Sequence, residues 1–237
     1  MTSMKRLLIL SWLLLILMAA AAAYAVNRLG GWQYALYRLQ YGDSGMYEHR
    51  KTLFERMPDR PGAIVFLGDS QIGLCEWQEM FADLSPVLNR GISGDHVQGV
   101  LDRLDEVLRH RPEKVFLEIG VNDLLWGKTP AEIAGPYREI VQKIRQARPD
   151  GQLFLLSVLP VNKKQRALST GNADIQALNG EIARIAKEFA LPYVDLYNQL
   201  TDASGDLSPQ FSSDGLHLNG LGYAMWKKQI KSYLYGS

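Results

Sequence analysis

Short apolar runs alternate with longer segments of helical periodicity through most of this chain, and this alternation limits the fold more than any other feature. We expect strands over residues 63–67, 86–89, 115–119, 153–158 and 193–196, and helices over residues 46–57, 97–110, 129–147, 172–189 and 220–233. Apolar runs of this length are typical of strands buried on both faces of a sheet. Their alternation with helices predicts a parallel sheet with helices packed on both of its faces.

Four short blocks occur in a fixed order, and three of them follow predicted strands. They are Gly68-Asp69-Ser70-Gln71, Gly91-Ile92-Ser93-Gly94-Asp95, Gly120-Val121-Asn122-Asp123 and Asp214-Gly215-Leu216-His217. The carboxyl ends of parallel strands share one edge of the sheet, and open α/β folds bind ligands there. One block alone would be weak evidence. All four in this order supply the parts that hydrolysis of an acyl ester needs.

Ser70, His217 and Asp214 are the candidate catalytic residues. A serine hydroxyl becomes a good nucleophile when a neighbouring base accepts its proton, and His217 is the candidate base. Asp214 lies three residues before His217. Its carboxylate is therefore near enough to hold the imidazole tautomer that presents a free nitrogen to Ser70. The alternative interpretation is structural, with Ser70 capping the segment that follows it.

The tetrahedral intermediate of ester hydrolysis needs hydrogen-bond donors for its negative oxygen, each lowering the barrier by roughly 3–4 kcal/mol. Gly94 is a candidate because a glycine lets its backbone N–H approach the substrate without an intervening side chain. Asn122 can add an amide N–H, and the N–H of Ser70 is a third candidate. The structural alternatives are a turn glycine at position 94 and a loop-stabilising side chain at position 122.

Several neighbouring residues are expected to support these loops or to line the cleft. We interpret Asp69, Asp95 and Asp123 as residues that tie their loops by hydrogen bonds rather than as catalytic groups. His96 follows directly after the second block and is a secondary candidate for lining the cleft. The segment Leu124-Leu125-Trp126 either walls an acyl pocket or, as we favour, packs in the core.

Ser70, Gly94, Asn122 and His217 match the four residues that name the SGNH hydrolase superfamily, also called GDSL esterases and lipases. The chain resembles this superfamily over about residues 60–234, and Asp214 completes the triad that the resemblance implies. The resemblance also implies a three-layer α/β/α, flavodoxin-like fold with a parallel central sheet, and no cofactor.

Three segments most resemble the branch of platelet-activating-factor acetylhydrolase-like enzymes. They are residues 89–95, 117–124 and 157–162. Two residues depart from the usual pattern. Gln71 stands where Ile or Leu is usual, and His96 where Thr is common. Neither departure removes a catalytic group, but both positions can alter the preferred acyl or leaving group.

Composition excludes several other classes. The 237 residues have room for one domain of roughly 200 residues and a leader. The net charge is +1 and the basic residues are spread along the chain, so nucleic acid is not an expected partner. Cys75 is the only cysteine, which excludes an intrachain disulfide, and the four histidines are too scattered to predict a metal site.

The first 26 residues differ from the rest. Lys5 and Arg6 precede an uncharged run over residues 7–26, which as a helix would span roughly 30 Å, the thickness of the hydrocarbon core of a bilayer. Basic residues before such a run hold that end in the cytoplasm, so we expect the remainder to be exported. Residues 1–26 are either a retained anchor, which we favour slightly, or a signal peptide cleaved near Ala23-Tyr24-Ala25.

Residues 27–60 are expected to form a juxtamembrane helical segment, and residues 61–237 the hydrolase domain. Aromatic residues in the first of these segments suit a membrane interface. Packing of an aromatic stripe on the domain is an equally good interpretation. The aromatic residues are Trp32, Tyr34, Tyr37, Tyr41 and Tyr47.

We therefore expect an exported or membrane-tethered serine esterase whose substrate is a small-molecule, glycan or lipid ester. Acetyl groups on an envelope or extracellular glycan are our first choice, because the branch resembled favours short acyl chains. Lysophospholipids and other lipid esters come second. Acyl transfer to a sugar hydroxyl shares the acyl-enzyme and stays open, as does the oligomeric state. A non-catalytic binding protein is the remaining alternative, although all five catalytic groups are present.

Overall fold

The computed structural model describes residues 3–28, 44–84 and 86–236, and the chain divides into two units, Met1–Gly45 and Met46–Ser237. In the first unit, α1 (Ser3–Arg28) is a helix on which large apolar side chains such as Leu14 are exposed. Among the helices in the described part of the chain, none is both long enough and apolar enough to cross a membrane. The aromatic residues from Trp32 to Tyr41 lie outside the described residues.

The second unit is built on a parallel sheet, as the alternation of strands and helices predicts. Its strands are β1 (Ile64–Gly68), β2 (Val87–Gly91), β3 (Lys114–Glu118), β4 (Gln152–Leu156) and β5 (Tyr193–Val194). Their order is β2-β1-β3-β4-β5, and every pairing is parallel. This order is that of a flavodoxin-like, doubly wound fold.

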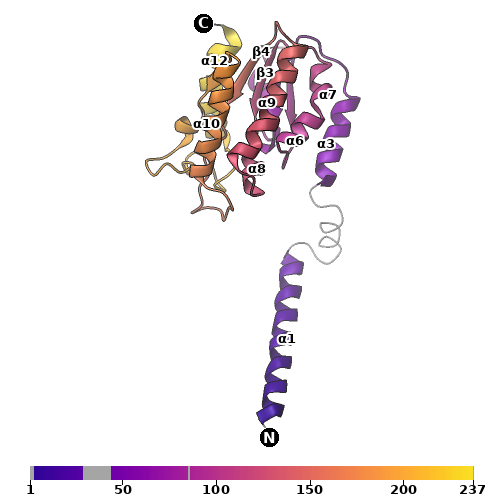
Figure 1. The fold of residues 1–237 in the computed structure, drawn as a ribbon, viewed down its shortest axis with the longest axis vertical. Coiled ribbons are helices and arrows are strands. Elements are labelled where there is room, and N and C mark those ends of the chain that lie inside the picture. Colours follow the sequence, from indigo (N-terminus) through magenta and orange to yellow (C-terminus); the bar gives the residue numbers. More distant parts are fainter. Residues whose placement is uncertain (1–2, 29–43, 85, 237) are drawn as a thin grey trace. The chain divides into compact units, whose positions relative to one another are not determined.

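The helices cover both faces of this sheet, and Figure 1 shows α9 and α10 side by side across one of them. They are α3 (Ser44–Arg56), α4 (Ser70–Gly73), α5 (Trp77–Met80), α6 (Val97–Asp102), α7 (Leu104–Leu108), α8 (Val121–Leu125), α9 (Pro130–Ala147), α10 (Asn172–Glu188), α11 (Tyr197–Leu200) and α12 (Gly220–Tyr235).

Alternate residues of each strand enter two separate cores. Leu67 of β1 packs in the core beneath α6, α9 and α10, whereas Phe66 packs in the core beneath α5 and α12. In the second core Phe66 stacks on Trp77 with ring centroids 4.0 Å apart. Burial on both faces explains why these strands read as continuous apolar runs.

The prediction of one continuous helix over residues 97–110 is wrong. The segment 97–110 forms two helices, α6 and α7, because the backbone leaves helical geometry at Arg103 (φ −109°, ψ 11°). The Arg103 side chain is buried, and it donates a 2.9 Å bond to Oδ2 of Asp95 and a 3.0 Å bond to the carbonyl of Gly68. The apolar periodicity continues across this break, so the pattern alone does not reveal it.

The strand register brings the first three blocks to one edge of the sheet. Gly68 pairs with Gly91 on one side and with Glu118 on the other, so β1, β2 and β3 end at the same level. A Cβ atom at Gly91 would overlap with the backbone of Gly73. The glycine therefore allows α4, and with it Ser70, to lie directly against the end of β2.

Candidate active site

Ser70 is the first residue of α4, immediately after β1. Asp69 caps this short helix, and its Oδ1 accepts a 2.9 Å hydrogen bond from the N–H of Gln71. The cap fixes the turn on which the serine lies. Oγ of Ser70 is 3.1 Å from Nε2 of His217, although the two residues are 147 positions apart in the chain.

Asp214 holds the other side of the His217 imidazole. Its Oδ2 lies 2.8 Å from Nδ1 of His217, and its Oδ1 accepts the backbone N–H groups of Leu216 at 3.0 Å and His217 at 2.7 Å. A carboxylate has no proton to donate, so Nδ1 carries the hydrogen and Nε2 offers its lone pair to Ser70. The structure thus brings the three predicted catalytic residues into one hydrogen-bonded series.

Electrostatics keeps Asp214 ionised. Burial by itself raises the pKa of Asp214, but the hydrogen bonds from the backbone of His217 and Leu216 and from the His217 ring outweigh it, so the pKa lies well below its ordinary value. An ionised carboxylate stabilises the imidazolium that forms when Ser70 gives up its proton.

A glycine shapes the loop that carries both residues. Gly215 has a φ of +75°, and a Cβ there would lie 2.6 Å from the carbonyl oxygen of Asn162. The two backbones are also joined by a hydrogen bond, in which the N–H of Asn162 donates to the Gly215 carbonyl at 2.8 Å. The turn brings Asp214 and His217 together three residues apart, and any other residue at position 215 would strain it.

The candidate oxyanion donors are Gly94, in the loop after β2, and Asn122, in the first turn of α8 after β3. Gly94 has a φ of +79° with open space around it, so its backbone conformation rather than crowding requires glycine. Nδ2 of Asn122 donates to the carbonyl of Asp95 at 2.8 Å and lies 3.4 Å from Oδ2 of Asp69. Asn122 therefore joins the residue after Gly94 to the residue before Ser70. Its second amide hydrogen makes only the long contact and can serve a substrate oxygen.

The three aspartates tie their loops, as their positions predict. Oδ2 of Asp123 accepts the N–H of Val97 at 2.9 Å, and its Oδ1 pairs with Lys128 at 2.8 Å. Asp95 pairs with Arg103. Burial raises the pKa of Asp69 to about 7; the N–H of Gln71 opposes this shift, and the carboxylates of Asp95 and Asp123 add to it.

Trp126 contradicts the favoured interpretation of its segment. Leu124 is buried as expected, but the Trp126 side chain is 70% exposed. It meets the ring of His96 edge-on, with centroids 5.3 Å apart. His96 lies two residues after Gly94, and Trp126 directly follows α8, the helix that carries Asn122. The pair therefore lies beside the segments that carry the oxyanion candidates.

Other polar residues of the site carry weaker signals in the sequence. Glu118 ends the apolar strand β3, Gln71 lies in the first turn of α4 just after β1, and both are buried. A polar residue directly after an apolar run is a detectable signal. Burial, with a smaller contribution from the Asp69 carboxylate, raises the pKa of Glu118 well above its ordinary value. Arg166, which contacts Asp214, has no motif that marks it.

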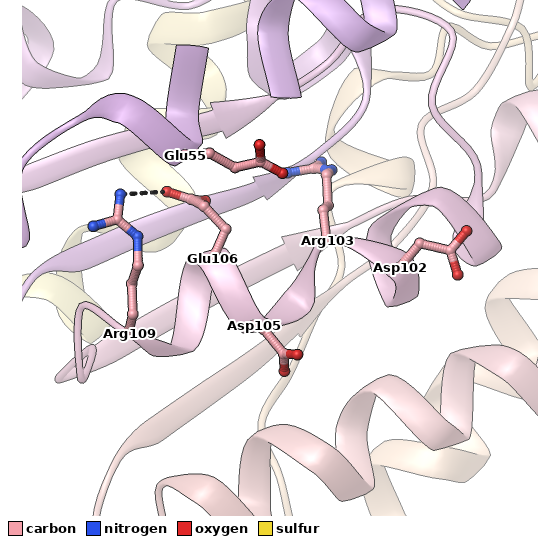
Figure 2. A pocket seen from close by; sticks show the side chains of 6 residues that line it. All are labelled: Glu55, Asp102, Arg103, Asp105, Glu106 and Arg109. Atoms are coloured by element: carbon pink, nitrogen blue, oxygen red, sulfur yellow. Dashed lines mark hydrogen bonds and ion pairs between the residues drawn. The ribbon is translucent and has the colours of Figure 1, made fainter. Parts of the chain in front are cut away.

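A charged pocket is lined by residues of and beside α3, α6 and α7, and none of the triad residues is among them (Figure 2). Its lining residues are Glu55, Asp102, Arg103, Asp105, Glu106 and Arg109. Arg103 connects it to Asp95, and Arg109 pairs with Glu106 at 3.4 Å. These ion pairs serve the packing of α6 and α7, and we assign the pocket no catalytic part.

A parallel α/β sheet with a serine, a histidine and an aspartate joined at its carboxyl edge defines a hydrolase of the nucleophilic-serine class. The chain belongs to the GDSL-like lipase/acylhydrolase family, whose model matches residues 42–225. This membership confirms the resemblance, and it makes the protein an enzyme of an ester-hydrolysing family.

Individual relatives agree with this membership. Human platelet-activating factor acetylhydrolase IB subunit alpha1 is 31% identical over 182 residues, which are 74% of this chain and 77% of the relative. Thioesterase 1/protease 1/lysophospholipase L1 of Escherichia coli is 31% identical over 146 residues, 61% of this chain and 62% of the relative. The crystal structure of a GDSL-like lipase from Bacteroides thetaiotaomicron has the same fold, with a TM-score of 0.69 at 24% identity over 79% of this chain and 96% of that chain.

Proposed function

We propose that this protein hydrolyses carboxylic esters through an acyl-serine intermediate on Ser70. The observation that carries the proposal is the pair of contacts on His217, 3.1 Å to Oγ of Ser70 and 2.8 Å to Oδ2 of Asp214. Nε2 of His217 accepts the hydroxyl proton as Oγ bonds to the ester carbon. The imidazolium then returns the proton to the alkoxy oxygen, and the alcohol leaves. Water attacks the acyl-serine by the same route and releases the acid.

The negative oxygen of each tetrahedral intermediate is held by the N–H groups of Ser70 and Gly94 and by Nδ2 of Asn122. Two of these donors are backbone groups fixed by a capped turn and by a glycine with positive φ. Donors that are already in place need no reorganisation during the reaction, and this is the main advantage of such a site.

The proposed substrate is a short acyl ester, with an acetyl group on a glycan as the first choice. The exposed ring of Trp126 beside His96 supports a sugar on the alcohol side. Nδ1 of His96 accepts the N–H of Gly99 at 3.1 Å, so in the neutral ring Nε2 carries a hydrogen and can donate. An apolar aromatic face next to a hydrogen-bond donor suits a pyranose ring.

Two alternatives remain proposals. The names of the relatives include a lysophospholipase, which favours a lipid ester as the second substrate class. Transfer of the acyl group to a sugar hydroxyl uses the same intermediate with a different acceptor. Measuring ester loss together with O-acetylated product, in the presence of a glycan, separates hydrolysis from transfer.

We also propose that the protein acts outside the cytoplasm. The support is in the sequence, where Lys5 and Arg6 precede the apolar run over residues 7–26. The mass of the amino-terminal peptide, measured on protein from the membrane and soluble fractions, distinguishes an anchor from a cleaved signal peptide. Intact protein recovered only from the cytoplasm would refute export.

The catalytic proposal is tested with nitrophenyl esters graded by acyl length, assayed on the full chain. We expect the highest kcat/KM with acetyl, a mass increase of one acyl group on Ser70 in quenched reactions, and no activity in Ser70→Ala. Ser204→Ala, which changes an exposed serine, is the matched control. Activity that survives in Ser70→Ala would refute the mechanism.

A further inference from the structure

Gln71, the residue after the nucleophile, is hydrogen-bonded to Leu216, the residue before the base. Its side chain is almost completely buried, with 2% of the residue exposed. Nε2 of Gln71 donates a 2.6 Å hydrogen bond to the carbonyl oxygen of Leu216. Leu216 directly precedes His217, so this bond fastens the loop that carries the base to the turn that carries the nucleophile.

The link closes a small ring. Two covalent peptide bonds, Ser70–Gln71 and Leu216–His217, are joined by two hydrogen bonds, 2.6 Å from Gln71 to Leu216 and 3.1 Å between Ser70 and His217. We infer that Gln71 is a positioning residue that sets the distance between His217 and Ser70. The inference rests on the proposed function, because it assigns a role within that reaction.

The main chain of Gln71 is fixed as firmly as its side chain. Its N–H donates to Oδ1 of Asp69 at 2.9 Å, and its carbonyl accepts a 2.8 Å bond from the hydroxyl of Tyr223 on α12. With both backbone groups held, the side chain has little freedom to follow a moving loop. The hydrogen bond from Gln71 therefore fixes the position of the Leu216 carbonyl.

The amide oxygen of Gln71 shows that a contribution to stability does not explain why a glutamine occupies this position. Oε1 of Gln71 is buried and has no hydrogen-bond partner among the described residues. A buried amide oxygen without a partner is destabilising. An apolar side chain of the same shape would remove that unpaired oxygen. What it would lack is the donor to Leu216, so the donor is the property that distinguishes glutamine here.

Loss of the donor should affect the chemical step and not substrate binding. The Gln71 side chain is buried, and its donor acts through the Ser70–His217 distance, which governs proton transfer. In Gln71→Met, which keeps the shape and removes the donor, we expect kcat to fall by about 10- to 100-fold. KM should change by less than about twofold. The midpoint of thermal unfolding should stay close to that of the parent. The substitution removes the unpaired Oε1 of Gln71 but leaves the Leu216 carbonyl without its donor.

Gln71→Glu supplies a pH-dependent rescue. A neutral glutamic acid can donate its O–H to the Leu216 carbonyl, whereas the ionised form cannot. The titratable groups around this position are Asp69 on the same turn, Glu118 on β3, Tyr223 on α12 and His217 on the base loop. All of them are also present in Gln71→Met, which adds no ionisable group, so the ratio for that variant records their own titration. We expect the Gln71→Glu to parent ratio of kcat/KM to rise as pH falls, and the Gln71→Met ratio to stay flat.

Tyr223→Phe is the matched control. It removes the bond to the Gln71 carbonyl and leaves the link to Leu216 intact. It should lower the unfolding midpoint more than Gln71→Met does, with a smaller loss of kcat.

Three outcomes would overturn the inference: unchanged kcat in Gln71→Met, kcat and unfolding midpoint falling together in that variant, or a flat Gln71→Glu ratio. The Gln71→Glu ratio decides the question if Gln71→Met does not fold. Failure of the proposed function is distinguishable, because the parent protein itself would then lack Ser70-dependent activity.

Discussion

Arg166 donates a 2.7 Å hydrogen bond to Oδ2 of Asp214, the same oxygen that accepts the bond from His217. The arginine is a cation close to the imidazole, so it disfavours the imidazolium that forms during the reaction. The side chains of Arg166 and Asp214 are 44% and 41% exposed. Solvent screening therefore limits the effect of the pair to about 0.2–1 kcal/mol.

Arg166→Gln should move the acid limb of the kcat/KM profile to higher pH by less than about one unit. The shift should shrink as salt is added, because the charges are exposed. The measurement is a pH series at low and high ionic strength. Lys164→Gln removes a charge from the same loop without touching Asp214, since Lys164 pairs with Asp206, and it should leave the profile in place. A shift to lower pH in Arg166→Gln would contradict the electrostatic role.

Asp69→Asn should stabilise the fold at alkaline pH. Burial raises the pKa of Asp69 to about 7, above its value of about 3.9 in the unfolded chain. Its contribution to stability is therefore fully present below about pH 4 and is lost as pH rises towards about pH 7. An asparagine does not ionise, yet its Oδ1 can still accept the Gln71 N–H.

The free energy of unfolding of Asp69→Asn, minus that of the parent, should therefore increase by an amount on the order of a few kcal/mol between about pH 4 and about pH 8. Denaturant titrations of both proteins across this range measure it. Asp59→Asn, at an exposed position, serves as the control and should show no such trend. A difference that does not depend on pH would show that Asp69 is ionised throughout.

Trp126→Ala should lower the activity on glycan esters more than the activity on simple esters. Loss of the aromatic face should lower kcat/KM for an acetylated oligosaccharide by about 5- to 20-fold, the equivalent of about 1–2 kcal/mol of ring contact. Activity on nitrophenyl acetate, which does not need a sugar contact, should stay within about twofold. Trp126→Phe should keep most of the glycan activity.

Leu53→Ala removes another exposed apolar side chain and is the control for the Trp126 series. Equal losses on both substrates in Trp126→Ala would mean that the tryptophan supports the oxyanion loop instead. A selective loss on a lysophospholipid would favour the lipid alternative.

Gly91→Ala should destabilise the fold and slow the reaction, because its Cβ would overlap with the backbone of Gly73 beside the nucleophile. Overpacking of this kind costs about 1–3 kcal/mol, and here we expect the upper end of that range. Gly180→Ala is the matched control, since Gly180 lies within α10 at an exposed position with open space around it. It should stabilise the protein by about 0.5–1 kcal/mol. Denaturant midpoints check both, and similar effects of the two substitutions would contradict the close packing of α4 on β2.

Much of this fold could be predicted because two periodicities dominate the sequence. The apolar runs before Gly68 and Gly91 lie in parallel strands, and the amphipathic segments after them are helices. The candidate site was also predictable where residue type, order and position at a strand end agree, as for Ser70, and where an acid and a base lie three residues apart, as for Asp214 and His217. Long-range polar contacts were not predictable. The bond between Gln71 and Leu216 spans 145 positions, and no local pattern encodes it.

The helix break at Arg103 and the exposure of Trp126 could not be predicted from the sequence, for a related reason. A periodic pattern records which residues are apolar, but it does not record where a single buried cation will draw the backbone out of a helix. Nor does it distinguish a tryptophan at a loop tip from one in a core. In both cases the deciding partner, Asp95 or His96, lies elsewhere in the chain.

The acid and the base of this site are three residues apart on one turn, and the geometry of that turn requires glycine at position 215. They must consequently travel together. A shift of that turn would carry the imidazole and its carboxylate away from the hydroxyl as one body, with the tautomer preserved. Loss of the contact between His217 and Ser70 would therefore leave the proton-accepting pair itself intact.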